Sequence, residues 1–498
     1  MTAMITNETL LMACIASPFA LAALTVLFHR VPALRDALNL LTPFVAPAAL
    51  LLLAGGPASL QLTQIVPGAG IAFAPEPVGL VFAGLVCVLW PVSMLYSLAY
   101  LYQNRAPRMT SFLVYYNLSI GCALAVAFAG NLLTLFIFYE VLTFCTYPLV
   151  THSRSREALA AGRFYLAVLV GSSTLLLLAA MVWIYLAAGT LDFVPGGILD
   201  GRIGDEQVKW LLLLVVFGAS KAAVMPLHGW LPRAMVAPVP VSALLHAVAV
   251  VKAGVFAIVK IILYIFGVDL LAGAGAGDWL VYIASFTIIA ASVVALRQTS
   301  LKKMLAWSTV GQLSYILLGA ALLKPAALLG AVLHLLAHGF GKITLFFAAG
   351  AIQTASGKTR LDEMRGIGRA MPWTMGLFTV AALVIVGLPP LAGFSSKWFL
   401  LEGSVAVGGY LPAAVLIAGS ALSAAYLVPV IYRAFFVAEA PVADVRRPAA
   451  RREAPTAMLI AMLLPALMCA VLFFAVDAVA GFTAAVPGFS AGDAGGAP

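Results

Sequence analysis

The chain has 498 residues, of which 63% are hydrophobic and 9% are charged, and its mean hydropathy is +1.07. These values exclude an ordinary soluble domain, in which about 25% of residues are charged, and indicate a polytopic membrane protein. The net charge of +9 does not indicate nucleic-acid binding, because the basic residues are spread through short loops without interleaved aromatic side chains.

The cysteines do not indicate a cofactor. Cys14, Cys87, Cys122, Cys145 and Cys469 are isolated from one another and form no C-x-x-C pair. Neither an iron–sulfur cluster nor a disulfide framework is therefore supported, and we expect these residues to pack as small side chains.

Hydrophobic runs that approach or exceed the length of a spanning helix, about 20 residues, occur throughout the chain. They cover residues 9–28, 38–55, 78–102, 109–128, 131–150, 162–188, 208–236, 242–266, 277–296, 303–323, 326–353, 372–400, 410–436 and 456–481. No strand alternation competes with this pattern. The sequence therefore predicts an all-α polytopic membrane protein with about 14 transmembrane helices.

Lysine and arginine are distributed unequally between the two sets of loops. The loops after the odd-numbered spans carry 20 of the 28 basic residues, whereas the opposite loops hold only Arg202, Lys209 and Lys324. Because cytoplasmic loops are enriched in lysine and arginine, we expect the odd loops to be cytoplasmic. Both termini then lie outside, in a bacterial-type cytoplasmic (inner) membrane.

Ionisable side chains also lie within the hydrophobic runs. They are Glu140, Lys221, Lys252, Lys260, Lys342, Lys397, His228, His246, His334 and His338. Such groups are costly inside a bilayer and indicate a functional site by default. For Lys260 we instead expect the side chain to reach the outer interface.

Glu140 and Lys221 offer opposite charges in neighbouring spans, so we expect them to approach within about 4 Å or to be bridged by one water. The alternative is a neutral Glu140 bonded to a hydroxyl such as that of Thr143. Lys252 and His246 share the following span, and lysine suits proton transfer because it can release its proton where arginine cannot.

His334, His338 and Lys342 are spaced four residues apart, so they share one helix face and drift by about 40° per step. A metal site is one interpretation, but without a nearby acidic residue a proton relay is favoured.

Prolines interrupt two of the runs. Pro226 follows Lys221, and Pro389, Pro390 and Gly393 precede Lys397. Paired interrupted segments are typical of transporters built from repeats, with the site at the breaks. We expect Gly393, Ser395 and Ser396 to let water approach Lys397.

Five stretches carry a family resemblance: FYEVLTFCTYPLV, KAAVMPLHGWLPRAMVAPVPVSALLHA, LKKMLAWSTVGQLSYILLGA, LHLLAHGFGKITLFFAAGAI and LPPLAGFSSKWFL. They resemble the antiporter-like subunits of respiratory complex I and of Mrp-type sodium/proton antiporters. Lysine at positions 252 and 397 is most similar to the D-type member of the Mrp antiporters.

The resemblance implies two inverted five-helix repeats, helices 4–8 (109–266) and 9–13 (277–436), with broken helices 7 and 12. Helices 1–3 (1–108) would precede them and helix 14 (456–481) would follow. The implied proton pathway runs from Glu140 and Lys221 through Lys252 to His334, His338 and Lys342, and ends at Lys397.

The sequence thus indicates a proton-translocating subunit of a multisubunit cation/proton antiporter, with other membrane subunits as partners and sodium as a candidate coupled ion. No cofactor, metal, nucleic acid or catalytic chemistry of its own is expected. The alternatives are a proton-pumping subunit of a redox-driven complex (complex I-like or membrane hydrogenase), a subunit of a bicarbonate-uptake system, and a passive membrane scaffold.

Overall fold

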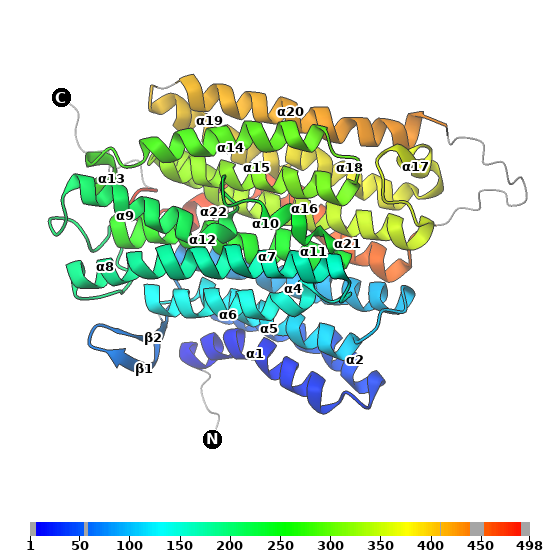
Figure 1. The fold of residues 1–498 in the computed structure, drawn as a ribbon, viewed down its shortest axis with the longest axis horizontal. Helices are drawn as coiled ribbons and strands as arrows, with labels where there is room; N and C mark the ends of the chain where they lie inside the picture. Colours follow the sequence, from blue (N-terminus) through cyan, green and yellow to red (C-terminus); the bar gives the residue numbers. More distant parts are fainter. Residues whose placement is uncertain (1–5, 54–57, 409, 439–452, 490–498) are drawn as a thin grey trace, which may run out of the picture.

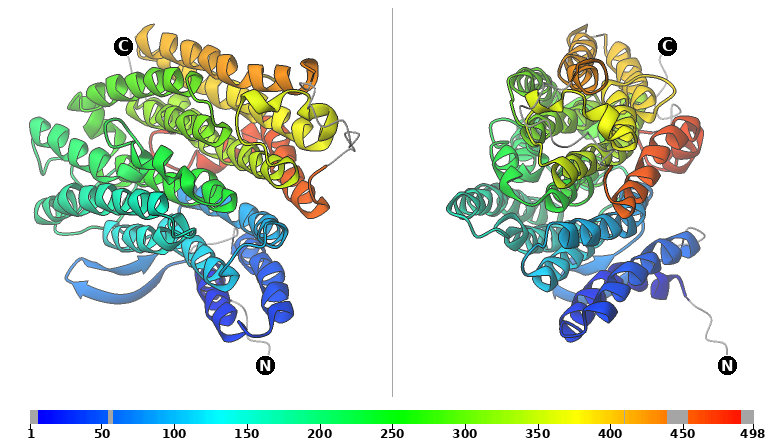
Figure 2. Two further views of the ribbon diagram at one scale, coloured as in Figure 1. Left: turned by 45° about the vertical axis from the view of Figure 1, so that its right-hand side comes forward. Right: turned by 90° about the vertical axis from the view of Figure 1, so that its right-hand side faces the viewer.

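The computed structural model describes residues 6–53, 58–408, 410–438 and 453–489. Most long helices run side by side along one direction, so that the bundle has two ends (Figure 1). One end carries α2 and α17, and the opposite end carries α13 and a β-hairpin. Seen close to end-on, the N-terminal helices form one edge of the bundle and α20 lies at the opposite edge (Figure 2).

Twelve helices in the described residues are long and apolar enough to span a membrane. They are α1 (Asn7–Leu27), α2 to α3 (Pro32–Leu53), α4 (Pro77–Gln103), α5 (Met109–Ala127), α6 (Leu132–Val150), α7 to α8 (Arg156–Ala188), α11 to the segment ending at Phe266 (Val239–Phe266), α14 (Asp278–Leu296), α15 (Leu301–Ala321), α16 (Pro325–Ser356), α20 (Tyr410–Phe436) and α21 (Thr456–Phe474).

The two other predicted spans are the interrupted ones. The first consists of α9 (Asp205–Gly218) and α10 (Trp230–Arg233), and the second of α18 (Pro372–Val386) and α19 (Ala392–Ala406). The remaining short helices are α12 (Val250–Ile261, within the span Val239–Phe266), α13 (Val268–Gly273), α17 (Ile367–Ala370) and α22 (Val476–Thr483). The predicted all-α membrane fold is confirmed.

The β-hairpin was not predicted. Strands β1 (Leu60–Val66) and β2 (Ala69–Phe73) pair antiparallel, with Leu60 opposite Phe73. The alternating residues LQLTQIV and the following Pro67–Gly68 were its sequence signal, because Gly68 adopts φ of +74° in the turn.

Two helical segments form the centre of the bundle. The most apolar 18-residue windows of Val239–Phe266 and Pro325–Ser356 are completely buried. By contrast, peripheral helices expose large apolar side chains such as Trp210, Phe286 and Trp398, as expected for surfaces that face lipid or partner subunits. The central helices are also those that carry Lys252, His334, His338 and Lys342.

The first break begins earlier than the sequence predicted. Helix α9 already ends at Gly218, so Lys221 lies within the break rather than before it. Proline at 226 excludes a helical turn directly before it, and side chains bind the backbone groups further upstream. The amide of Lys221 donates to the Tyr139 hydroxyl (3.2 Å), and the indole of Trp230 donates to the carbonyl of Ser220 (3.1 Å).

The second break contains Pro389 and Pro390, as predicted, but Gly393 lies inside α19. A Cβ at Gly393 would stand 1.8 Å from the carbonyl oxygen of Val384. Gly393 therefore allows α19 to pack against the end of α18, and the expectation that it mainly admits water is wrong.

The basic loops of the described residues gather at one end of the bundle, which carries α2, the 104–108 and 151–155 connections and α17 (Figure 1). Arg446, Arg447, Arg451 and Arg452, which belong to the same set of predicted loops, lie outside the described residues.

Replacement of Gly393 by alanine should therefore destabilise the protein. The new methyl group would overlap backbone that cannot move freely, which costs about 1–3 kcal/mol. Gly376→Ala on α18 is the control, because a Cβ there meets nothing within 4 Å. Thermal unfolding in detergent should show a lower midpoint for Gly393→Ala only, and equal midpoints for the two variants would contradict this packing role.

Candidate functional site

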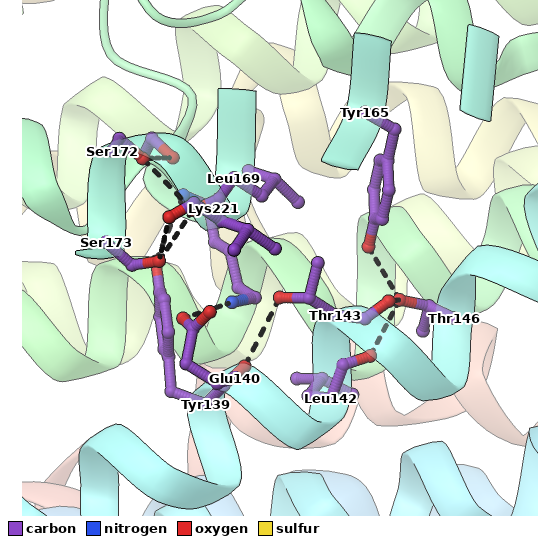
Figure 3. Close-up of polar contacts among 12 residues, drawn as sticks. Tyr139, Glu140, Leu142, Thr143, Thr146, Tyr165, Leu169, Ser172, Ser173 and Lys221 are labelled. Carbon is purple, nitrogen blue, oxygen red and sulfur yellow. Dashed lines mark hydrogen bonds and ion pairs between the residues drawn. The ribbon is translucent and has the colours of Figure 1, made fainter. Parts of the chain in front are cut away.

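Glu140 on α6 and Lys221 in the first break point toward each other, as Figure 3 shows. The Lys221 ammonium lies 3.9 Å from Oε1 of Glu140, so the predicted approach within about 4 Å is confirmed. The lysine side chain is fully buried, and the Glu140 side chain is 14% exposed. The pair is long for a hydrogen bond and therefore holds the two charges in contact without locking them together.

The Tyr139 ring is the second partner of Lys221. The ammonium stands 3.2 Å from the ring centroid, a cation–π contact. Thr143, the alternative partner for a neutral Glu140, instead donates its hydroxyl to the carbonyl of Tyr139 (3.4 Å). Around the pair, Thr146 bonds Tyr165 at 2.6 Å (Figure 3). The site thus joins α6, α7 and the first break.

Gly254 permits the central helix to approach this break. A Cβ at Gly254 would lie 2.2 Å from the amide nitrogen of Ala222 and 2.4 Å from the carbonyl carbon of Lys221. Since any larger residue would push α12 away, this glycine determines how closely the helix that carries Lys252 can lie to Lys221.

Lys252 and His338 meet at the centre of the molecule. Nζ of Lys252 lies 2.8 Å from Nδ1 of His338, and both side chains are fully buried. The contact joins α12 to α16, and hence the first half of the chain to the second. Sequence spacing did not indicate this pair, because it depends on how two distant helices pack.

The other residues of α16 have their own polar partners. Nδ1 of His334 lies 3.0 Å from the Ser396 hydroxyl, and the His334 and His338 rings are 6.1 Å apart. Lys342 donates to the Ser308 hydroxyl (2.6 Å) and to the carbonyl of Leu305 (3.2 Å).

Lys397 binds the end of the broken helix. Its ammonium donates to the carbonyls of Ile385 (2.7 Å) and Val386 (3.0 Å), the last two residues of α18, and to the Ser420 hydroxyl (3.0 Å). A positive charge is favourable at a helix C-terminus, where carbonyls lack helical partners. The ammonium also faces the Tyr315 ring, 5.1 Å from its centroid.

A cavity of about 210 Å³ adjoins Lys397. Its walls include Trp398 and Ile417, which are 56% and 62% exposed and lie within helices, so the cavity opens on the flank of the bundle. Lys397 is 9% exposed whereas Lys221 is 0% exposed. The Lys397 site is therefore the more open of the two, as the sequence suggested.

Two predicted histidines have fewer polar contacts. His246 is fully buried and packs on the Phe346 ring (4.6 Å between centroids), and neither ring nitrogen has a hydrogen-bond partner among the described residues. His228 packs against Trp307. Among the described residues, no three histidine, cysteine or acidic side chains lie close enough to hold a metal ion.

The chain is matched, over residues 129–423, by the family described as NADH:quinone oxidoreductase/Mrp antiporter, TM. It belongs to this family.

Individual relatives come from more than one branch of this family. NADH-quinone oxidoreductase subunit N of Desulforudis audaxviator is 34% identical over 460 residues, which cover 89% of this chain and 90% of the relative. The D component of the Na(+)/H(+) antiporter of Alkalihalophilus pseudofirmus is 28% identical over 361 residues (71% and 72%). A chain of the membrane-bound sulfane sulfur reductase, an archaeal respiratory membrane complex, shares the fold with a TM-score of 0.84 at 24% identity, over 96% of this chain and 97% of that one.

One buried ion pair of this antiporter-family chain was not predicted from its sequence. Lys260 is fully buried, and the expectation that it reaches the outer interface is wrong. Its ammonium lies 3.0 Å from Oε2 of Glu76, which precedes α4, and donates to the carbonyl of Ala129 (2.6 Å). Glu76 resembled a loop residue because it stands just before Pro77, at the start of a hydrophobic run.

Removal of one partner of this pair should be more harmful than removal of both. Lys260→Met would leave Glu76 without its cation, and breaking a buried pair costs about 3–5 kcal/mol, whereas the double variant Glu76→Gln/Lys260→Met should recover most of that loss. Thermal unfolding of the singles and the double measures the difference. The exposed Lys209–Glu206 pair is the control, because its removal should cost less than about 1 kcal/mol. A double variant as unstable as the sum of the singles would contradict a coupled pair.

Proposed function

We propose that this chain is a proton-translocating subunit of a multisubunit cation/proton antiporter. The observation that carries the proposal is the 2.8 Å contact between Lys252 and His338. It lets a proton pass between the two halves of the chain through groups that bind and release protons. Family membership supports the same function.

The proposed pathway begins at Glu140 and Lys221, crosses Lys252 and His246 to His338, His334 and Lys342, and ends at Lys397. It relies on the loose ion pair at its start. If Glu140 moves away, Lys221 holds its proton less tightly, and the proton can pass inward. We propose further that residues 109–266 and 277–436 are the two inverted repeats, since each contains one broken helix and one lysine at the break.

A redox-driven complex is the second candidate setting. The identity of 34% to a subunit of NADH-quinone oxidoreductase favours it. In that setting partner subunits would supply the electron transfer, while the proposed proton pathway within this chain would be the same.

The orientation in the membrane is also part of the proposal. We place the end with the basic loops in the cytoplasm and both termini outside, in an inner membrane. Other membrane subunits would cover part of the exposed apolar surface, and sodium is the candidate coupled ion.

Substitution of arginine for Lys252 or Lys342 should abolish proton transport. Arginine keeps the positive charge but does not release a proton near neutral pH. The measurement is proton flux, followed with a pH-sensitive dye in vesicles that contain the whole complex. Lys324→Arg is the matched control, because Lys324 is exposed in a loop. Transport at the parental rate by either buried variant would show that charge alone suffices, and the proposed function would fall.

A further inference from the structure

A pocket of about 400 Å³ enters the second half of the bundle from the end that carries the basic loops. Its lining includes Gln298 and Thr299 from the loop before α15, Arg360 and Asp362 from the loop after α16, and Arg433 from α20. These polar groups suit water, which occupies about 30 Å³ per molecule in the liquid. The pocket therefore has room for several water molecules.

Tyr426 lies at the inner part of this pocket. It is one of the lining residues, yet its side chain is only 4% exposed. Tyr426 stands ten residues from the end of α20 at Phe436, which places it about 15 Å from that end of the helix. The pocket thus reaches from the loops well into the depth of a spanning helix.

A chain of hydroxyl groups continues from Tyr426 to Lys342. The Tyr426 hydroxyl lies 2.7 Å from that of Ser308, and the Ser308 hydroxyl lies 2.6 Å from the Lys342 ammonium. Both distances are those of short hydrogen bonds, and Ser308 and Lys342 are buried. Lys342 is therefore linked to the pocket through two hydrogen bonds.

We propose that this chain of hydroxyls is a proton inlet for the second half of the subunit, separate from the Glu140–Lys221 site. The inlet rests on the proposed function, since it supplies Lys342 of the proposed pathway. In one transfer, water in the pocket gives a proton to the Tyr426 oxygen, the Tyr426 hydrogen passes to Ser308, and the Ser308 hydrogen passes to a neutral Lys342 amine. One proton enters and one ammonium forms, so both hydroxyls remain neutral.

The bonds around a charged Lys342 show the opposite polarity that follows such a transfer. Lys342 donates to Ser308, Tyr426 donates to the Ser423 hydroxyl (3.1 Å), and Ser423 donates to the carbonyl of Gly419 (2.8 Å). Rotation of the hydroxyls would reset the chain for the next proton. Serine and tyrosine hydroxyls can do this because each both donates and accepts.

The charges of the pocket favour protons over metal cations. Its lining contains two guanidinium groups and one carboxylate, and Arg360 holds that carboxylate, Asp362, through two bonds of 3.0 and 3.1 Å. A hydrated metal ion would meet a net positive wall, and the buried hydroxyl chain has no carboxylate to replace its water. A proton passes by exchange of hydrogen bonds and needs no such site.

Tyr426→Phe tests the inlet, because it keeps the ring and removes only the hydroxyl. We expect proton flux through vesicles containing the complex to fall at least tenfold, and the same fall for Ser308→Ala. The double variant should be no slower than either single, since both lie on one path. Ser308→Thr should retain most of the flux because it restores the hydroxyl, and Tyr432→Phe, at an exposed position on the same helix, should retain all of it. Equal thermal midpoints will show that the variants assemble alike.

Parental flux in Tyr426→Phe and Ser308→Ala would overturn the inlet. If Lys342→Arg abolishes flux in the same preparation, only the inlet fails; if that variant also transports normally, the proposed function fails with it. Ala425→Cys, at an exposed position that lines the pocket, tests the side of access with a membrane-impermeant thiol reagent. The native cysteines of the described structure are buried. Labelling from the basic-loop side is expected, and labelling only from the opposite side would overturn the direction of the inlet.

Discussion

A lysine ammonium within an apolar bundle needs protein groups in place of water, and this requirement explains much of the structure. Lys397 takes the last carbonyls of α18, which are free because the helix stops at Val386. Lys221 takes a tyrosine ring and a loosely held carboxylate, and Lys252 takes a histidine. The helix breaks and the polar side chains are therefore two answers to one problem.

The partners of the buried lysines also differ in what they allow. Carbonyl oxygens only accept, so the contacts of Lys397 with α18 stabilise its charged form. Histidine and hydroxyl groups both donate and accept, and they stand next to Lys252 and Lys342. These two central lysines are thus surrounded by groups that can pass a proton on. The Lys260–Glu76 pair, in contrast, is short and closely bonded, as suits a structural contact between α12 and the start of α4.

Short stretches of the sequence predicted the features that depend on local chemistry. Apolar length predicted the spans, proline predicted both interruptions, and opposite charges in neighbouring spans predicted the approach of Glu140 and Lys221. Contacts between distant helices could not be predicted in this way. The Lys252–His338 contact depends on the packing of α12 against α16, and the pairing of Lys260 depends on a glutamate that resembled a loop residue. The start of the first break was also misplaced, because Tyr139 and Trp230 bind its backbone from other segments.

The central claim is that the ion pair of Glu140 and Lys221 controls proton movement, and proton flux through vesicles containing a Glu140→Gln complex tests it most directly. Glutamine has nearly the same shape but cannot ionise, so it cannot form or release the ion pair. We predict that the complex assembles normally and loses at least nine-tenths of its flux, whereas Glu157→Gln, at an exposed position on α7, keeps it. Normal flux through an assembled Glu140→Gln complex would contradict the account.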